Sequence, residues 1–346
     1  MTRSPMPNRT RVRMRDVATR CGVSISTVSL VLSGDARIPE DTARRVLQAV
    51  KAMEYRPSVL ARSLARRTSR TIAVILPEFA FQRNKPFYFQ ALQGIHSQTQ
   101  PAGYKMLVEA ANRVFLQRRY YLRMLREQSA DGMLYLAASV NDSFLGEIEK
   151  EAFPFVLVGA YADGVNLPCA NSADAEGAKL AVQHLVKLGH KAIGHLAGSP
   201  DISHGRDREK GYREAMRSAG LKVEPAWVVQ GNFELEMAEK AAVDLVKAGV
   251  TAIFAASDVM GIGALRALRS LKKSVPHDIA VVGMDDLEIA SWTNPALTTV
   301  RYDINAMAEL ATKYVIRRAQ SPILPKNPLS EIPPPELVVR ESCGAQ

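Results

Sequence analysis

Residue groups that could perform chemistry are few in this sequence. His184, His190 and His195 lie close together, but no carboxylate completes a metal-ligand spacing with them. Asp285-Asp286 follows an apolar run, yet adjacent residues at a strand end point to opposite sides and do not form an acid–base pair. Gly261-Ile262-Gly263 lacks the third glycine of a dinucleotide motif, and neither a G-x-S-x-G turn nor a P-loop is present. We therefore expect no enzyme, no metal and no cofactor.

The first 70 residues and the rest of the chain differ sharply in net charge. The 346 residues have a formal charge of +10, from 45 Lys and Arg against 35 Asp and Glu. Residues 1–70 hold 15 of the basic and 5 of the acidic side chains, so the whole excess lies there. This distribution indicates a small nucleic-acid-binding module attached to a neutral globular body, and it argues against a uniformly basic coat protein.

The chain shows no sign of export. No apolar run is long enough to span a bilayer, and the Arg-rich N-terminus lacks the apolar core of a signal peptide. Cys21, Cys169 and Cys343 are too few and too widely spaced for a disulfide framework or a zinc site. We expect a protein of a reducing, cytoplasmic compartment.

The basic segment has the pattern of three short helices. Met14, Val17, Ala18 and Cys21 lie on one face of a first helix, which Gly22 ends. Ser24 is a suitable N-cap for a second helix, and Pro39 opens a third over about 39–53. A helix, a glycine turn and a second helix within 14–33 match the helix-turn-helix plan.

From residue 71 onward, apolar β-branched runs alternate with helical patterns. The predicted strands are 71–76, 105–109, 132–136, 155–158, 192–196, 227–230, 252–255 and 280–283. The predicted helices are 88–100, 116–128, 175–188, 208–219, 235–248 and 261–271. Such alternation through two stretches predicts two doubly wound parallel α/β lobes, with a crossing at Tyr161–Gly164.

Sequence motifs along the chain point to one family. In the basic segment they are Arg15–Ala18, Gly22–Ser24, Thr27–Ser29, Val31-Leu32, Tyr55–Pro57 and Ala61–Leu64. In the body they are Ile72–Ile75, Leu188–His190, Arg208, Gly211-Tyr212, Gly283–Asp285, Pro295–Thr299 and Val338–Ser342. Together they resemble the lactose/galactose repressor family of bacterial transcription regulators, in order and over nearly the whole chain.

The resemblance implies how the second helix would read DNA. Its first residues, Ile25 and Ser26, would contact base edges in the major groove. Ser24, Thr27 and Ser29 would contact phosphates, or their hydroxyls would only cap and pack. These alternatives stay open at the level of the sequence.

Two further positions bear on the operator. Leu30 departs from the family, which usually has Arg there to bind guanine; a leucine would touch a thymine methyl or simply pack. The resemblance also implies a hinge helix that contains Arg62, a phosphate contact, and Leu64, which would wedge into the minor groove. Ordinary linker packing is the alternative for Leu64.

The resemblance implies that the body is similar to periplasmic solute-binding proteins, with a ligand between the lobes. The residues carried over to this site are Tyr88, Tyr161, His204, Arg208, Phe233, Ser257 and Asp285. Arg208 and Asp285 would bind hydroxyls or polar ring edges, although Arg208 could instead pair with nearby carboxylates. Tyr88 and Phe233 could equally be core aromatics. His204 and Ser257 depart from the commoner sugar-binding pattern, so a plain hexose is not implied.

These observations predict a domain plan and a function. We expect a helix-turn-helix module at 1–56, a hinge and linker at 57–70, one lobe from 71–160 with 290–321, and the other from 161–289 with 322–346. The expected function is a homodimeric transcriptional repressor of a pseudo-palindromic double-stranded operator. A sugar, sugar derivative or nucleobase-like effector would modulate it, without membrane contact. The alternatives are an envelope solute-binding protein and a doubly wound enzyme with a basic tail.

Overall fold

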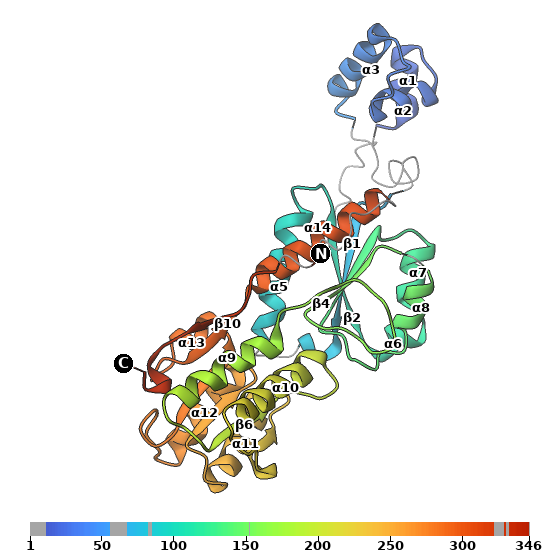
Figure 1. The fold of residues 1–346 in the computed structure, drawn as a ribbon. Coiled ribbons are helices and arrows are strands. Elements are labelled where there is room, and N and C mark those ends of the chain that lie inside the picture. Colours follow the sequence, from blue (N-terminus) through green and yellow to red (C-terminus); the bar gives the residue numbers. More distant parts are fainter. Residues whose placement is uncertain are drawn as a thin grey trace, which may run out of the picture. The chain divides into compact units, whose positions relative to one another are not determined.

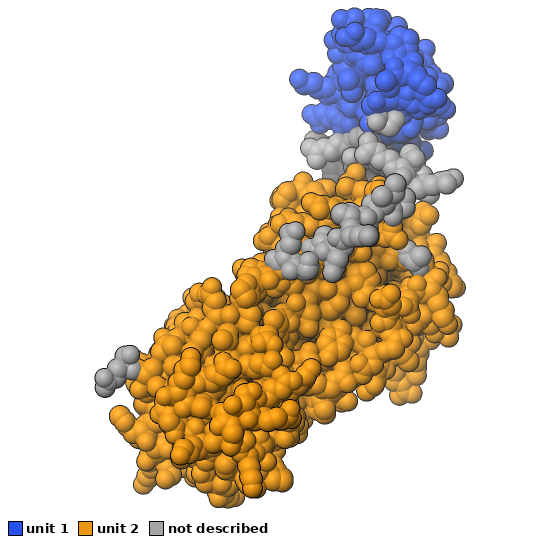
Figure 2. Space-filling view, viewed as in Figure 1, with its two compact units in different colours: residues 1–68 blue, residues 69–346 orange. Residues whose placement is uncertain are grey.

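The computed structural model describes residues 12–55, 68–81, 85–151, 153–321, 329 and 332–345. The chain divides into two compact units, Met1–Thr68 and Ser69–Gln346 (Figure 2). The first holds a small helical core of its own, and the second holds two sheets with their covering helices (Figure 1).

The described part of the first unit, residues 12–55 and 68, has the helices α1 (Met14–Cys21), α2 (Ile25–Ser33) and α3 (Glu40–Ala52). Gly22 ends α1 with a φ of 64°, a left-handed conformation that favours glycine. The core is small and entirely apolar, and its buried residues are Val17, Ala18, Val28, Val31, Val46, Ala49 and Tyr55. The predicted helix-turn-helix within 14–33 is thereby confirmed.

The first sheet of the second unit has the order β2-β1-β3-β4-β5, with every neighbouring pair parallel. Its strands are β1 (Thr71–Pro77), β2 (Lys105–Ala111), β3 (Gly132–Leu136), β4 (Phe155–Val158) and β5 (Cys169–Ala170). Its helices are α5 (Pro86–Thr99), α6 (Arg113–Gln117), α7 (Tyr120–Arg126), α8 (Leu145–Lys150) and α14 (Ile304–Gln320), and η1 (Glu78–Phe81) follows β1.

Strand β1 lies inside this sheet and is covered on both faces. Ile72, Val74 and Leu76 belong to the same apolar cluster as residues of α5 and α14. Ala73 and Ile75, at the alternate positions, pack in the cluster that holds residues of α6 and α7. The continuous apolar run therefore follows from two covered faces.

The second sheet has the order β11-β10-β9-β8-β6-β7, with only β11 antiparallel. Its strands are β6 (Ile193–Ala197), β7 (Val228–Gln230), β8 (Ala252–Ala255), β9 (Ala280–Asp285), β10 (Thr298–Arg301) and β11 (Glu336–Val338). Its helices are α9 (Asp174–Lys187), α10 (Ser203–Ser218), α11 (Leu235–Lys247), α12 (Asp258–Ser270) and the short α13 (Glu288–Ser291).

Sheet membership differs from the predicted lobe boundaries at 161 and 290. Strand β5 pairs with β4 in the first sheet, so the chain passes to the second sheet only after residue 170. Strand β10 pairs with β9 in the second sheet, and the chain returns after residue 301 to form α14 beside α5. Tyr161–Gly164 is a loop before β5. We propose lobes of 69–170 with 303–321, and of 171–302 with 332–345.

Two predicted helices begin earlier than expected, and both changes bring residues to the lobe junction. Helix α10 begins at Ser203 rather than at 208, and α12 begins at Asp258 rather than at 261. Gly205 lies inside α10, and a Cβ at this position would come within 2.3 Å of the Ser199 carbonyl oxygen. This glycine allows close packing and does not break the helix, which is why the sequence pattern is misleading here.

The predicted helix over 116–128 is two helices in the structure. Arg119 separates α6 from α7 with a φ of 49°. The predicted hinge helix, with Arg62 and Leu64, lies outside the described residues.

Candidate functional site

The start of α2 presents side chains away from the core of the first unit. Ile25, its first residue, is 52% exposed, and Ser26 is exposed as well. Val28 and Val31, further along α2, are buried. A large aliphatic side chain left open at a helix start is available to another molecule, as the prediction for Ile25 requires.

The hydroxyl groups around this position stabilise the helix start. Ser24 Oγ accepts a hydrogen bond from the backbone N–H of Thr27 at 3.0 Å and lies 2.8 Å from Thr27 Oγ1. Ser24 is thus the N-cap that the sequence predicted. Ser29 and Leu30 are half-buried and lie one turn further along α2.

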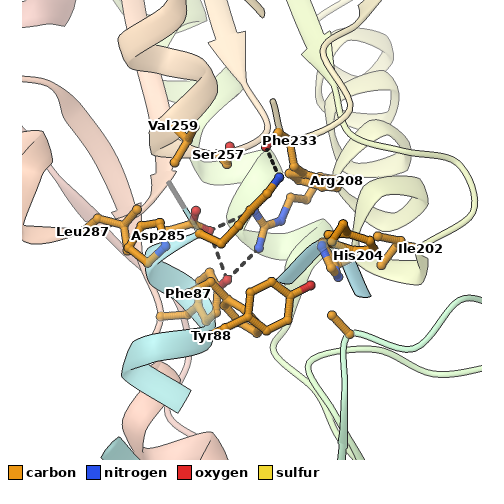
Figure 3. Close-up of a pocket in the computed structure, with 15 residues that line it drawn as sticks. Phe87, Tyr88, Ile202, His204, Arg208, Phe233, Ser257, Val259, Asp285 and Leu287 are labelled. Atoms are coloured by element: carbon orange, nitrogen blue, oxygen red, sulfur yellow. Dashed lines mark hydrogen bonds and ion pairs between the residues drawn. The ribbon is translucent and has the colours of Figure 1, made fainter. Parts of the chain in front are cut away.

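A cavity of about 70 Å³ lies between the two lobes of the second unit (Figure 3). Six of the residues predicted for the effector site line it, namely Tyr88, His204, Arg208, Phe233, Ser257 and Asp285. Its other lining residues include Phe79, Lys85, Phe87, Ala137, Ile202, Val259, Leu287 and Tyr302. Strand ends and helix starts of both lobes therefore meet there, as expected for a doubly wound ligand site.

Tyr161 is the predicted residue that does not line this cavity. Its hydroxyl donates to Asp207 Oδ1 at 3.1 Å, and its backbone N–H donates to Ser203 Oγ at 2.9 Å. The residue belongs to the loop before β5 and holds that loop of the first lobe against α10. It therefore bridges the two lobes in this structure.

Arg208 is the centre of a buried polar network. Its Nε donates to Asp174 Oδ1 at 2.8 Å, its Nη1 to Asp285 Oδ1 at 3.0 Å and its Nη2 to the Tyr302 hydroxyl at 2.9 Å. Nη1 also donates to the carbonyl oxygen of Ala256. The side chain is 2% exposed. Asp174 lies just after the first crossing and Tyr302 just before the second. One guanidinium therefore connects two of the crossings to the ends of the second sheet.

Asp285 is held in an unusual backbone conformation at the end of β9. Its φ of 130° is sterically unfavourable for a residue with a Cβ, and the cost is about 1–3 kcal/mol. Its Oδ1 accepts from both Arg208 and the Tyr302 hydroxyl, which fixes the side chain in the cavity wall. Burial raises the pKa of Asp285, and the neighbouring Arg208 opposes that rise.

His204 lies at the start of α10 and faces the first lobe. Its Nδ1 is 3.0 Å from the carbonyl oxygen of Gly159, and its ring centroid is 4.9 Å from that of Phe233. Since a carbonyl can only accept, Nδ1 carries the proton and Nε2 keeps its lone pair. Burial, with the positive charge of Arg208, lowers the pKa of His204 to about 3, so the ring is neutral at physiological pH.

The remaining predicted residues form walls of the cavity. The ring of Tyr88 meets those of Phe79 and Phe87 edge-on, at centroid distances of 6.2 and 5.2 Å, and burial raises the pKa of the Tyr88 phenol. Phe233 packs on Gly198, where a Cβ would come within 2.1 Å of the ring. Ser257 caps α12 by accepting from the Met260 N–H at 3.3 Å. Its hydroxyl is thus committed as an acceptor to the helix.

Lys85, Asp174 and Tyr302 are site residues that sequence reasoning missed. Lys85 Nζ lies 2.6 Å from Glu234 Oε1 of the other lobe. Pro86 at the start of α5 marks a helix start, but nothing in the local pattern identifies a partner so distant in sequence. Asp174 and Tyr302 also gain their importance through Arg208, which is remote from both in the sequence.

Hydrogen bonds also join the first lobe to the start of α10. Arg206 forms an ion pair with Asp163, with contacts of 2.9 and 3.0 Å. The backbone N–H of Val140 donates to the carbonyl of Asp201 at 2.8 Å. The structure thus has the two lobes in contact around a small cavity.

Within the ranges that the structure describes, no three His, Cys, Asp or Glu side chains come together as metal ligands would. His184 and His195, which the sequence places close together, have separate partners in Cys343 and the carbonyl of Phe254. Among the described helices, none has both the length and the apolar character that a bilayer crossing requires.

Comparison with known proteins extends over both units. Residues 13–58 match the model of the bacterial regulatory proteins of the lacI family, and residues 182–343 match a periplasmic binding protein-like domain. The HTH-type transcriptional repressor PurR of Photobacterium profundum is 30% identical over 334 residues, which cover 95% of this chain and 98% of that protein.

Two solved structures agree with this assignment. A lac repressor dimer bound to operator and the anti-inducer ONPF superposes with a TM-score of 0.81 at 25% identity, over 97% of this chain and all of that one. A complex of the transcriptional regulator CelR with cellobiose has a TM-score of 0.71 at 28% identity, over 96% of this chain and all of that one.

A helix-turn-helix unit followed by a two-lobed α/β body with an interlobe cavity defines a DNA-binding transcription regulator with an effector domain. The similarity along the whole chain identifies the family. The protein belongs to the LacI family of bacterial regulatory proteins.

Proposed function

We propose that this chain is a transcriptional repressor that binds a pseudo-palindromic operator as a homodimer and responds to a small effector between its lobes. The observation that carries the proposal is the exposed start of α2, where the aliphatic side chain of Ile25 is 52% exposed on a helix-turn-helix unit with an apolar core. The repressor PurR and the operator-bound lac repressor, to which the chain is similar, support this interpretation. Such a protein acts in the bacterial cytoplasm, at the nucleoid.

In this proposal α2 lies in the major groove with Ile25 and Ser26 at base edges. Thr27 and Ser29 contact phosphates, and Leu30 touches a thymine methyl where an arginine would bind guanine. Ser24 contributes mainly through the cap that orients the helix. Arg62 and Leu64 complete the contact in the minor groove, and both remain predictions from the sequence.

The effector occupies the cavity between the lobes. Tyr88, Phe233 and Ser257 provide its walls, and His204, Arg208 and Asp285 provide its polar groups. An effector changes DNA binding only if it binds two lobe arrangements with different affinity. The bridges between the lobes, such as Arg206 with Asp163, would differ between those arrangements.

The homodimer would use an apolar face at the lobe junction. Phe89 on α5 is 65% exposed, Ile289 on α13 is 43% exposed and Trp292 is 69% exposed. All three line a groove of about 610 Å³. An exposed group of large apolar side chains of this kind marks an interaction surface, and the lac repressor that superposes on this chain is a dimer.

A gel-shift assay with DNA fragments from around the gene tests the proposal. Ile25→Ala should weaken specific binding at least tenfold and leave the non-specific affinity nearly unchanged, because no charge is removed. Leu47→Ala is the matched control, since Leu47 lies on α3 of the same unit and is also 52% exposed. A wild-type chain that shifts no fragment specifically, at any salt concentration, would refute the repressor function.

A further inference from the structure

The cationic groups of the interlobe cavity are largely committed to partners within the protein. The guanidinium of Arg208 donates to Asp174, Asp285, Tyr302 and the Ala256 carbonyl, which leaves one of its five N–H groups without a partner among the described residues. The ammonium of Lys85 donates to Glu234 and to the carbonyl of Phe233. A negatively charged ligand group would therefore find little that is free to bind it.

Two acceptor atoms in the cavity remain open. Asp285 uses Oδ1 for both Arg208 and Tyr302, and no described residue donates to its Oδ2. His204 donates through Nδ1 to Gly159, so its Nε2 offers a lone pair. The Tyr88 hydroxyl also has no partner among the described residues and can donate or accept. Two lone-pair sites thus await hydrogen-bond donors.

The charges behind the cavity wall also disfavour an anion. Asp174 and Asp285 both face the single positive charge of Arg208, with side chains 1% and 8% exposed. A ligand carboxylate or phosphate beside Asp285 would lose its hydration and meet a like charge that Arg208 does not fully compensate. A hydroxyl, an amine or a ring N–H at the same place would complete the network.

The walls of the cavity suit a compact ring. Phe79, Phe87, Tyr88 and Phe233 contribute aromatic surfaces, and Ile202, Val259 and Leu287 contribute aliphatic ones. Figure 3 shows His204 and Asp285 on different sides of this space. A ring held between such walls can present donors at two edges, one toward each acceptor.

We infer that the effector is a small ring compound, uncharged or cationic, which donates hydrogen bonds to Asp285 Oδ2 and His204 Nε2, and that carboxylates and phosphates are rejected. The inference rests on the proposed function, because it concerns the ligand of the same cavity. His204 is the specificity residue that it adds.

Thermal shift of the full chain with neutral or cationic probes and their anionic counterparts tests the inference. The pairs are benzamidine and benzoate, 2-aminobenzimidazole and benzimidazole-2-carboxylate, and D-glucose and D-gluconate, with D-glucose 6-phosphate added. At least one neutral or cationic probe should raise the Tm, and no anionic probe should do so. Stabilisation by an anionic probe, or by no neutral or cationic probe, overturns the inference.

Variants locate the binding of any stabilising probe. His204→Phe keeps the ring against Phe233 but removes the acceptor, so the Kd of that probe should rise at least tenfold. His190→Phe is the matched control, because His190 lies in the same lobe, contacts Thr251 and does not line the cavity. An unchanged Kd in His204→Phe overturns the inference.

Asp285→Asn tests the charge without changing the shape of the side chain. At least one anionic probe that leaves the wild-type Tm unchanged should raise the Tm of this variant, and no such gain with any anionic probe overturns the inference. Operator binding without any probe is measured alongside. If the chain binds operator but fails these tests, only the inferred ligand class is refuted. If the chain binds no operator, the proposed function is refuted.

Discussion

Lys85 Nζ lies 2.6 Å from Glu234 Oε1, and this ion pair joins the residue before α5 in one lobe to the N-cap of α11 in the other. The lysine also donates to the Phe233 carbonyl at 3.2 Å, and its side chain is only 9% exposed. Phe233 has a φ of 59°, so the segment that receives the lysine is itself in an unfavourable conformation. The contact holds that segment over the cavity.

Charge reversal should show how strongly this pair couples the lobes. Lys85→Glu and Glu234→Lys should each lower the free energy of unfolding of the body by about 1–3 kcal/mol, because each leaves like charges in contact in a mostly desolvated place. The double variant should recover part of that loss. Recovery is incomplete because the bond to the Phe233 carbonyl is not rebuilt.

Chemical denaturation of the four chains measures this coupling as a double-mutant cycle. Hydrogen exchange of residues 232–238 should be faster in each single variant and return toward the wild-type rate in the double variant. Losses that simply add, with no recovery, would show that the ion pair does not connect the lobes energetically.

Arg208→Ala should destabilise the body by about 3–5 kcal/mol, because it leaves Asp174 and Asp285 buried without their positive partner. Tyr302→Phe removes only a hydroxyl that bonds Arg208 and Asp285, and its cost should be about 1–2 kcal/mol. Urea denaturation of both variants compares the two losses. An Arg208→Ala loss no larger than that of Tyr302→Phe would contradict the central role of the guanidinium.

The Arg208 network could not be predicted from the sequence, whereas many of the strands could. Local patterns predict strands such as 132–136, 155–158 and 252–255 with the bounds that the structure has. Short apolar runs determine such elements locally. The role of Arg208 as the link between two crossings depends on Asp174 and Tyr302, which only the tertiary fold brings together.

The same limit applies to the lobe boundaries and to one site residue. Strand β5 has two residues, too few for a periodic pattern, and it belongs to the first sheet only through its pairing with β4. Family position places Tyr161 in the cavity, whereas in the structure its hydroxyl bonds Asp207. In contrast, the cap at Ser24 is predictable because a cap depends on neighbours within a few residues.

Ser24 allows helix stability to be separated from operator contact. Ser24→Ala removes the acceptor for the Thr27 N–H and should lower the stability of the first unit by about 1 kcal/mol. Ser24→Asp restores a capping oxygen and should keep the stability, but its negative charge near DNA phosphates should weaken binding to any sequence. Thermal unfolding and gel shift measure the two effects. Equal operator affinity of Ser24→Asp and wild type would place Ser24 away from the DNA.

Acid should destabilise the second lobe through His195. Its ring is buried and stacked between Tyr212 and Phe254, with centroid distances of 4.9 and 5.0 Å, and Nε2 is a buried atom without a partner among the described residues. Burial lowers the pKa of His195 to about 3 from an ordinary value of 6.5. Between these values the unfolded chain binds one more proton than the folded chain. The contribution of neutral His195 to the free energy of unfolding is therefore complete above pH 6.5 and is lost as the pH falls toward 3.

His195→Phe isolates this contribution, because the phenyl ring keeps the stack and cannot take up a proton. Below pH 6.5 the wild-type free energy of unfolding should fall by up to about 1.4 kcal/mol more per pH unit than that of the variant. Urea denaturation at intervals from about pH 5 to 7.5 measures both slopes. His96→Gln, at an exposed position on α5, serves as the control and should retain the wild-type slope. Because His204 remains in the variant with a pKa lowered to about 3, some pH dependence should persist. Identical slopes for His195→Phe and wild type would show that His195 is not the group that titrates.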